Sequence, residues 1–308
     1  MKKRRKIKEN KNIECKGTIL ILLTALISGL SIVINKFFVV KIDPLVFTSV
    51  RAIIIGLVFL GISLYISKTN KQKFKKVSWK YLISIGLVGG GLAFWLFFSG
   101  LKLTMAGRAA FLHKTLPIYA GIFAYIFLKE KITKKQLTAL AVMMLGLALL
   151  EFNKLAPGVK MGDWLVLGAT VLWAVENTIA KKAMINKESN YVVTFSRMFF
   201  GSLLLFAIIF ITGKSNLLYT LTSQQLLYII ISTALLFLYV LTWYLGLKYI
   251  NLSKASTILL LSPVISLVLG YIWLKESILA LQLLGSLLIL IGAYTIARTK
   301  SEKRIIEA

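Results

Sequence analysis

Hydrophobic positions along this chain come in long runs, separated by short polar segments that are rich in lysine. A helix needs roughly 20 mostly apolar residues to cross the hydrocarbon core of a bilayer. In that core every backbone N–H and C=O must be paired, which a helix achieves by itself. The pattern predicts an all-α polytopic membrane protein with ten transmembrane helices, at about residues 17–39, 44–66, 80–101, 106–128, 134–152, 163–185, 190–212, 225–247, 253–274 and 279–298.

The second half of the chain repeats the first after 146 residues. Three pairs of features are related by this shift: the segments YIFLKE at 125–130 and YIWLKE at 271–276, the arginines Arg51 and Arg197, and the prolines Pro117 and Pro263. Self-similarity of this extent indicates an internal duplication. We predict two repeats of five helices, over residues 17–152 and 163–298, between a basic tail at 1–16 and a second tail at 299–308.

The number of helices in each repeat has a geometrical consequence. Because five is odd, the second repeat enters the membrane from the opposite side, and the two halves are predicted to be inverted copies. Inverted repeats are common in secondary transporters, which bind their substrate near the membrane midplane between the halves. They offer a route to alternating access, since the halves can exchange conformations and open the site to the other face.

The composition agrees with a membrane protein and excludes other classes. The 308 residues are 58% hydrophobic, with a mean hydropathy of +0.81, which is too apolar for a water-soluble globule. The net charge of +27 lies in short loops and tails, so we do not attribute it to nucleic-acid binding. If the N-terminus is cytoplasmic, 27 of the 38 lysines and arginines fall in inner segments and 8 in outer ones. This bias predicts that both termini are cytoplasmic. The single cysteine, Cys15, excludes an intramolecular disulfide.

Each half has an arginine in its second helix, a proline in its fourth, and Leu-x-Glu at the end of the fourth. In this order the chain resembles the drug/metabolite transporter superfamily, and within it the ten-helix bacterial exporters built from two EamA-type domains. The resemblance covers roughly residues 17–298. It implies a central cavity lined mainly by helices 1, 3 and 4 and the corresponding helices 6, 8 and 9. It also implies transport, usually export, of amphiphilic metabolites, without naming one.

Charged residues inside the predicted helices are functional candidates, because a charge at membrane depth is costly. We interpret residues present in both repeats as scaffold, and residues present in one repeat as free to serve the substrate or coupling. The duplicated Arg51 and Arg197 are expected to anchor backbone carbonyls or helix ends or to extend to the membrane interface, with a gating or substrate role left open. The duplicated Glu130 and Glu276 stand at helix ends and are expected to be scaffold.

The prolines are duplicated as well. Pro117 and Pro263 fall inside the fourth and ninth predicted helices, where a proline removes one backbone hydrogen bond. The freed carbonyls belong to His113 and Leu259, four residues earlier. Two interpretations remain open, namely a packing kink and a hinge whose free acceptor faces the cavity.

Three polar residues have no polar counterpart in the other repeat: His113, Lys114 and Glu176. Lys114 is expected to bind a carboxylate or phosphate, or else to pair with Glu176 or to extend toward the outer interface. Glu176 lies mid-helix, at a depth similar to that of the proton-coupling glutamate of small multidrug-resistance proteins, distant relatives of the family. It is expected to bind a proton or an amine, or to pair with Lys114. His113 is expected to handle protons or to be a satisfied core residue.

Aromatic side chains are concentrated in the third and eighth predicted helices. With one tryptophan of the sixth helix, four of them are candidates for an amphiphilic cavity wall: Trp95, Trp173, Tyr239 and Trp243. Tyr239 and Trp243 are four residues apart and share a helix face. The alternative is that these aromatic side chains face lipid or serve packing.

These features predict a secondary transporter of the plasma membrane, specifically an exporter of a small metabolite that bears a carboxylate or phosphate. An alternative is a proton-coupled exporter of cationic drugs that uses Glu176. A remote alternative is a non-transporting membrane scaffold. We expect no enzyme activity, cofactor or metal site. The partners expected are a small-molecule substrate and the lipid bilayer, with proton coupling open. One monomer is sufficient to form the cavity, and the oligomeric state is open.

Overall fold

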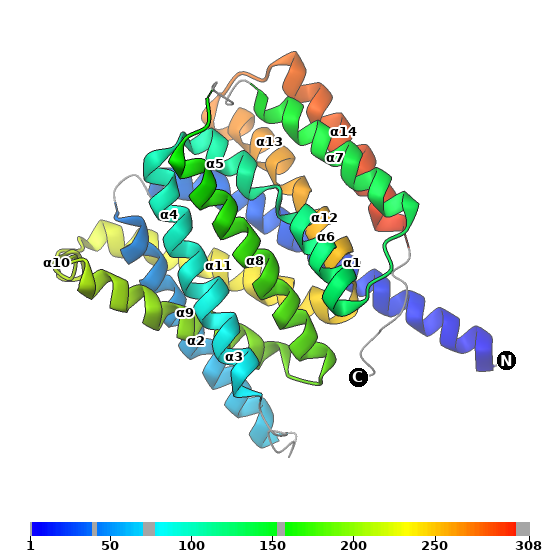
Figure 1. The fold of residues 1–308 in the computed structure, drawn as a ribbon, viewed down its shortest axis with the longest axis horizontal. Coiled ribbons are helices and arrows are strands. Elements are labelled where there is room, and N and C mark those ends of the chain that lie inside the picture. The colour runs from blue at the N-terminus through cyan, green and yellow to red at the C-terminus, as the bar shows by residue number, and fades with distance from the viewer. Residues whose placement is uncertain (1, 39–41, 70–77, 153–157, 300–308) are drawn as a thin grey trace.

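The computed structural model describes residues 2–38, 42–69, 78–152 and 158–299, and all the regular elements in these ranges are helices (Figure 1). The first half contains α1 (Lys2–Phe38), α2 (Pro44–Thr69), α3 (Trp79–Ile85), a π-helix (Gly86–Leu92), α4 (Ala93–Leu103), α5 (Ala106–His113), α6 (Leu116–Leu128) and α7 (Lys134–Glu151). The second half contains α8 (Met161–Ile185), α9 (Asn190–Ile211), α10 (Asn216–Tyr219), α11 (Ser223–Tyr249), α12 (Leu252–Ile258), a 3-10 turn (Leu259–Leu261), α13 (Ser262–Leu274) and α14 (Ala280–Arg298). Residues 300–308 of the predicted C-terminal tail lie outside the described residues.

Within the described ranges, eight helices are long and apolar enough to cross a bilayer, so the predicted count of ten is not confirmed. The remaining two predicted spans, 134–152 and 163–185, form the helices α7 and α8. Helix α7 carries three charged residues, Lys134, Lys135 and Glu151, and α8 carries four, Asp163, Glu176, Lys181 and Lys182. In α8 the polar side chains of Glu176, Asn177 and Lys181 are buried in the protein.

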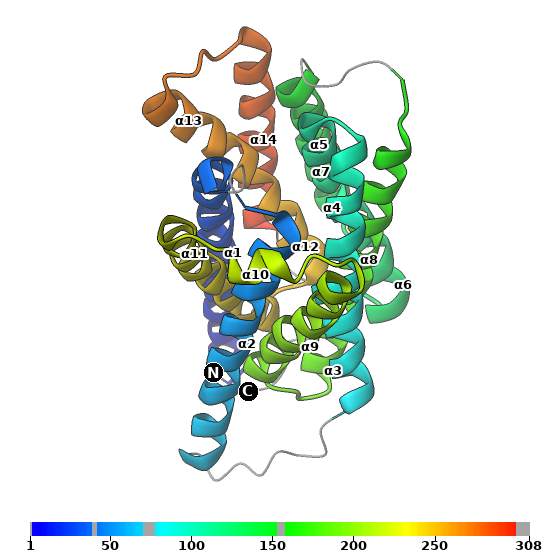
Figure 2. The ribbon, with the colours of Figure 1, turned by 90° about the vertical axis from the view of Figure 1, so that its left-hand side faces the viewer.

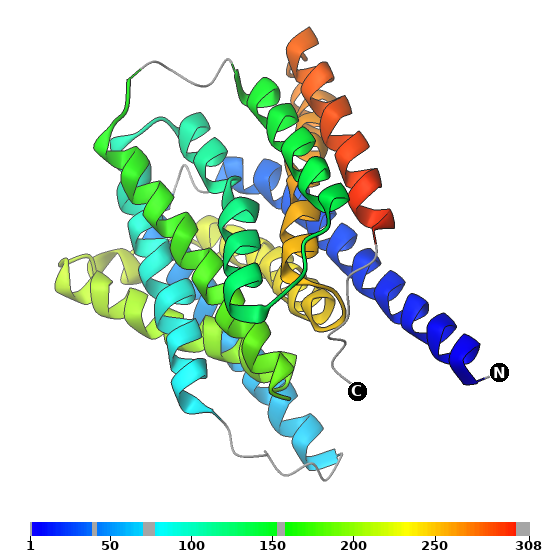
Figure 3. The same cartoon turned by 45° about the vertical axis from the view of Figure 1, so that its right-hand side comes forward.

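The helices pack in pairs that bring the two halves together. Helix α1 packs on α11 and α13, while α8 packs on α4 and α6 (Figure 2). Helix α7 lies along α14 (Figure 3), and α2 lies along α9. Helices α7 and α14 are antiparallel, since Gly146 faces Gly285 while Gly292 faces Ala139. They are also very close, because a Cβ atom added to Gly146 would lie 2.6 Å from the carbonyl oxygen of Gly285. Each contact of this kind joins one repeat to the other.

The fourth and ninth predicted helices are broken, and this corrects the picture of a proline inside a continuous helix. The chain leaves the helical path at Lys114 and Thr115, between α5 and α6, and Pro117 lies in the first turn of α6. Pro263 has the same place in α13, after the 3-10 turn. A proline is well tolerated there, since an N–H in the first turn has no intrahelical partner. The break brings Lys114 to the middle of the protein.

A glycine-rich π-helix interrupts the third predicted span. It covers Gly86–Leu92 and packs closely on α9. A Cβ atom on Gly90 would overlap the backbone carbonyl of Arg197, and one on Gly89 would overlap the side chain of Glu176. The glycines therefore allow α9 and α8 to approach the third span more closely than any other residue would permit.

Candidate functional site

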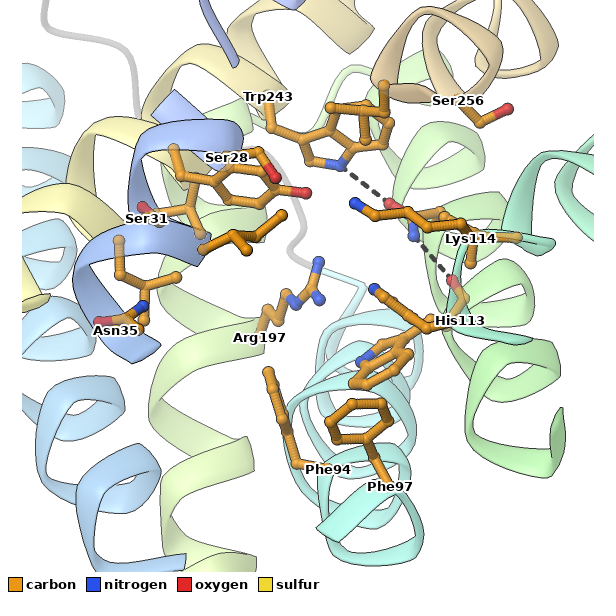
Figure 4. A pocket seen from close by; sticks show the side chains of 18 of the residues that line it. Ser28, Ser31, Asn35, Phe94, Phe97, His113, Lys114, Arg197, Trp243 and Ser256 are labelled. Atoms are coloured by element: carbon orange, nitrogen blue, oxygen red, sulfur yellow. Dashed lines mark hydrogen bonds between the residues drawn. The ribbon is translucent and has the colours of Figure 1, made fainter. Parts of the chain in front are cut away.

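A cavity of about 380 Å³ lies between the two halves (Figure 4), which is within the usual size range of small-molecule sites. The helices α1, α2, α4, α5, α6, α8, α9, α11 and α12 contribute to its wall, together with the breaks that follow α5 and α12. Its polar and charged lining residues are Ser28, Ser31, Asn35, Arg51, His113, Lys114, Asn177, Arg197, Ser232 and Ser256. The described lining therefore contains two arginines, one lysine and no aspartate or glutamate.

Lys114 lines this cavity at the break between α5 and α6. Its Nζ atom donates a hydrogen bond to Ser262 Oγ at 2.7 Å, which joins it to the start of α13. Lys114 takes part in none of the ion pairs found among the described residues. Glu151 attracts it electrostatically without forming such a pair. Figure 4 shows the Lys114 side chain extending toward the centre of the cavity.

Glu176 is paired with Arg197, which differs from the predicted alternative of a pair with Lys114. Arg197 Nη1 lies 3.1 Å from Glu176 Oε2, and the Tyr244 hydroxyl donates to Glu176 Oε1 at 2.6 Å. Arg197 also donates to the Tyr244 oxygen at 3.1 Å. Glu176 is 0% exposed and does not line the cavity, whereas Arg197 does. The scaffold role expected for Arg197 therefore does not account for its position at the cavity wall.

Arg51, the repeat counterpart of Arg197, has neutral partners. Its Nε atom donates to the Phe47 carbonyl at 3.1 Å, and its Nη1 atom donates to Ser232 Oγ at 2.7 Å. The hydroxyl of Ser232 in turn donates to Asn35 Oδ1 at 2.6 Å. The guanidinium carbon also lies 3.9 Å from the centre of the Phe47 ring. The anchoring expected for Arg51 thus includes one backbone carbonyl, and the residue also lines the cavity.

One wall of the cavity is aromatic. The rings of His113 and Trp173 lie 4.7 Å apart, and Phe97 and His113 lie 5.6 Å apart, both edge to face. Phe94 packs on Trp173 at 5.1 Å. Trp173 is held in place because its Nε1 atom donates to the Gly89 carbonyl at 2.9 Å. The Nδ1 atom of His113 is buried and has no hydrogen-bond partner among the described residues, and its proton-handling role stays a prediction.

Tyr239 and Trp243 line the cavity from α11, as their shared helix face predicts. Trp243 Nε1 donates to Asn177 Oδ1 at 2.9 Å, and the amide of Asn177 donates to the Trp173 carbonyl at 2.7 Å (Figure 4). Trp95 does not line the cavity, and its residue is 39% exposed. It lies next to Phe94 on α4 and therefore points away from the face that carries Phe94 and Phe97.

The remaining predicted residues fall into two groups. Pro117 lines the cavity, while Pro263 is buried beside it at the start of α13. Glu130 and Glu276 lie outside the cavity. Glu130 accepts hydrogen bonds from the N–H groups of Leu252 and Ser253, at the N-terminus of α12, which fits the expected scaffold role.

Sequence reasoning missed the neutral polar residues of the cavity. Asn35, Asn177 and the lining serines are polar positions inside predicted membrane helices, and this was a signal that could have found them. It also counted two buried lysines, Lys181 and Lys254, among the basic residues of the inner segments. Lys181 donates to the carbonyls of Leu247 and Ile250, and Lys254 donates to Glu14 at 3.0 Å.

Comparison with known proteins agrees with this architecture. The model of the EamA-like transporter family matches the chain twice, over residues 15–152 and 160–298. The chain belongs to the EamA-like transporter family. It is a multi-pass membrane protein with two EamA repeats, and members of this family act as transporters rather than enzymes.

Individual EamA relatives span nearly the whole chain. An uncharacterized transporter of Clostridium kluyveri is 27% identical over 288 residues, which cover 90% of this chain and 92% of that protein. The uncharacterized transporter YoaV of Bacillus subtilis is also 27% identical, covering 92% of this chain and 98% of its own length. A solved crystal structure shares the fold with a TM-score of 0.76 at 16% identity, and the match covers 92% of this chain and 98% of that one.

Proposed function

We propose that this EamA-family transporter is a secondary exporter of a small amphiphilic anion, a metabolite that bears a carboxylate or a phosphate. The anion binds in the central cavity, and alternating access carries it across the membrane. The observation that carries this proposal is the charge of the described cavity lining, which contains Arg51, Lys114 and Arg197 and no acidic residue.

Two of these three cations form no ion pair with an acidic side chain among the described residues. The contacts of Arg51 are with a carbonyl, a hydroxyl and an aromatic ring, and the direct contact of Lys114 is with a hydroxyl. A buried charge without a partner costs several kcal/mol. An intramembrane cation therefore indicates a function that repays this cost. An anionic substrate supplies the missing negative charge.

The aromatic wall supports an amphiphilic substrate. His113, Phe97 and Trp173 form a packed cluster on one side of the cavity, and Lys114 approaches from the same break in the chain that follows His113. A ligand with an apolar body and one anionic end can bury the body against these rings. Its anionic end can then accept hydrogen bonds from Lys114.

The paired packing of the helices supports ten spans in two inverted repeats. Under the shift of 146 residues, the contacts of α1 with α11 and α13 correspond to the contacts of α8 with α4 and α6. The pairs α2–α9 and α7–α14 correspond to themselves. This is the contact pattern expected of a two-fold axis, and it supports the proposal that α7 and α8 cross the membrane as well. Inverted repeats of this kind support alternating access.

The charge bias of the loops supports a plasma-membrane protein with both termini in the cytoplasm. The alternative function, export of cationic drugs by Glu176, gains no support from the cavity. Glu176 does not line it and is engaged by Arg197 and Tyr244. A non-transporting scaffold would have no need of two cations without an ion pair at a cavity whose described lining contains no acidic residue.

The experiment uses three ligands that share a phenyl ring and differ in charge: benzoate, phenyl phosphate and benzylamine. A ligand that binds only the folded protein raises its stability by about 2.7 kcal/mol at 100 times its dissociation constant. We expect benzoate or phenyl phosphate, and not benzylamine, to raise the thermal midpoint of the purified protein and to move through proteoliposomes.

Lys114→Gln should weaken binding of the anion at least about tenfold, because it removes a charge-assisted hydrogen bond. The matched control is Lys80→Gln, since Lys80 is exposed on α3 away from the cavity. Binding of benzylamine alone, or anion transport that is intact in Lys114→Gln, would refute the proposal.

A further inference from the structure

We infer that Glu176 is an internal counter-ion that occupies Arg197 in the empty cavity and is displaced from it when an anionic substrate binds. This inference rests on the proposed function and deepens it, because it names Arg197 as the second anion-binding group. It makes Glu176 a residue that sets affinity and selectivity without touching the substrate.

Arg197 and Glu176 lie in the order that this inference requires, with Arg197 nearer to the cavity. Arg197 lines the cavity, and Glu176 lies behind it with no exposed surface. The guanidinium group therefore stands between the substrate space and the carboxylate. Figure 4 shows Lys114 and Arg197 extending toward the same central space from different walls. An anion bound there by Lys114 comes within reach of the second cation and competes with Glu176 for it.

The two oxygen atoms of the Glu176 carboxylate have different partners. Tyr244 donates to Oε1 at 2.6 Å, while Oε2 faces Arg197 at 3.1 Å. No donor other than Arg197 lies at Oε2 among the described residues, and that contact does not have the alignment of a hydrogen bond. Tyr244 can therefore keep Glu176 in place while Arg197 turns to a new partner.

The repeat shows that the fold does not require this arrangement. In the first repeat the position of Glu176 is Leu30, that of Tyr244 is Phe98, and Arg51 stands in place of Arg197. Arg51 is buried among neutral partners, so an arginine at this position needs no carboxylate beside it. The carboxylate is present in one half only, and a scaffold role does not explain this asymmetry.

The π-helix provides the space for the carboxylate. A Cβ atom on Gly89 would overlap the Glu176 side chain, and the counterpart of Gly89 in the second repeat is Leu235. Glu176, Tyr244 and Gly89 therefore form one set of residues that occurs once in the molecule. The set holds a negative charge against the single cavity arginine that has a carboxylate partner among the described residues.

The test measures the affinity of the purified full-length protein for phenyl phosphate by titration calorimetry. Glu176→Gln removes the internal competitor and keeps the shape of the side chain. We expect this variant to bind phenyl phosphate about tenfold more tightly than the wild type. The ligand no longer competes with a carboxylate for Arg197, and the coupling energy of a close charge pair corresponds to at least this change in affinity. Adding Arg197→Gln to this variant should abolish the gain. The matched control is Glu188→Gln. The Glu188 carboxylate accepts a hydrogen bond from the Ser78 N–H away from the cavity, and its loss should leave the affinity for phenyl phosphate unchanged.

Tyr244→Phe is the second variant, because the first repeat already has phenylalanine at this position. It removes the hydrogen bond that holds Glu176 while Arg197 turns to the substrate, and should therefore lower the affinity for phenyl phosphate by about two- to threefold. Equal or weaker binding by Glu176→Gln, or tighter binding by Tyr244→Phe, would overturn the inference. If the wild type binds phenyl phosphate and Lys114→Gln does not, the proposed function survives that outcome. If no variant binds any anion, both proposals fall.

Discussion

The hydroxyl of Ser253 donates a hydrogen bond to Glu130 Oε2 at 2.7 Å and so joins the end of α6 to the start of α12. The backbone N–H groups of Leu252 and Ser253 donate to the same carboxylate at 2.8 and 3.1 Å. The first N–H groups of a helix lack intrahelical partners, and the positive end of its dipole favours an anion. The glutamate of the Leu-x-Glu motif in one repeat thus caps a helix of the other.

Glu130→Gln should destabilise the protein without changing its ligand selectivity. The change removes the negative charge from three hydrogen bonds, and a hydrogen bond to a charged group is worth roughly 1.5–3 kcal/mol. We expect a loss of about 2 kcal/mol, seen as a lower thermal midpoint in detergent. The affinity for phenyl phosphate should stay at the wild-type value. A variant with an unchanged midpoint would show that this cap does not contribute to stability.

Gly90→Ala should disrupt the contact between the π-helix and α9. A methyl group at this position would overlap the carbonyl of Arg197, which is backbone and cannot turn aside. We expect a loss of roughly 1–3 kcal/mol, the usual cost of overpacking, together with weaker anion binding because α9 carries Arg197. The control is Gly61→Ala on α2, where no atom lies within 4 Å of the new methyl group and stability should not fall. Equal midpoints for the two variants would contradict the close packing of α9.

The ion pair between Asp43 and Lys214 should stabilise the protein in a pH-dependent way. It lies outside the membrane-spanning helices, with the two side chains 2.7 Å apart. Burial alone would raise the pKa of Asp43, but hydrogen bonds from Lys214 and the Leu45 N–H lower it below 3.8. A carboxyl with a lowered pKa contributes stability that is present above its unfolded pKa and is lost as the pH falls through its folded pKa.

Asp43→Asn should therefore lower the thermal midpoint at neutral pH by a small amount, corresponding to less than about 1 kcal/mol for a partly exposed pair. The difference between wild type and variant should stay constant from about pH 5 to pH 8 and shrink below pH 4. Thermal unfolding at a series of pH values measures this. A difference that grows as the pH falls would show that the sign of the effect is wrong.

Cys15 reports the orientation of the protein in the membrane. It is the single cysteine of the chain and is exposed on α1. If the N-terminus is cytoplasmic, a membrane-impermeant maleimide should label Cys15 in inside-out vesicles and leave it unlabelled in intact cells. Cys15→Ser is the control for nonspecific labelling. Labelling in intact cells would reverse the proposed topology and with it the inner and outer assignments of the loops.

Reading the repeats against each other located the candidate site only in part. The absence of a counterpart pointed to Lys114 and His113, and both line the cavity. The same rule assigned Arg197 to the scaffold, because Arg51 duplicates it. The two arginines occupy equivalent positions, and what differs is the set of side chains around them, most of which belong to other helices. A comparison of single positions cannot detect such a difference.

The sequence also did not indicate which face of a helix is turned toward the cavity. Trp95 and Phe94 are adjacent and both aromatic, yet only Phe94 lines the cavity. In a membrane helix both the lipid-facing and the protein-facing sides are apolar, so periodicity carries little information about which side is buried. Lys181 and Lys254 were counted with the inner segments for a related reason, since their carbonyl and carboxylate partners are distant in sequence.

The sequence by itself determined that this is a helical membrane protein with two related halves, because apolar run length and internal repetition are properties of the chain alone. It also identified Lys114 as a cation at membrane depth. Only the tertiary structure decided which charges meet. The partner of Glu176 is Arg197 rather than Lys114 because α8, α9 and α11 converge behind the cavity wall. A charge inside a membrane protein selects its partner by distance in space, and that distance is set by packing between helices that are far apart in the sequence.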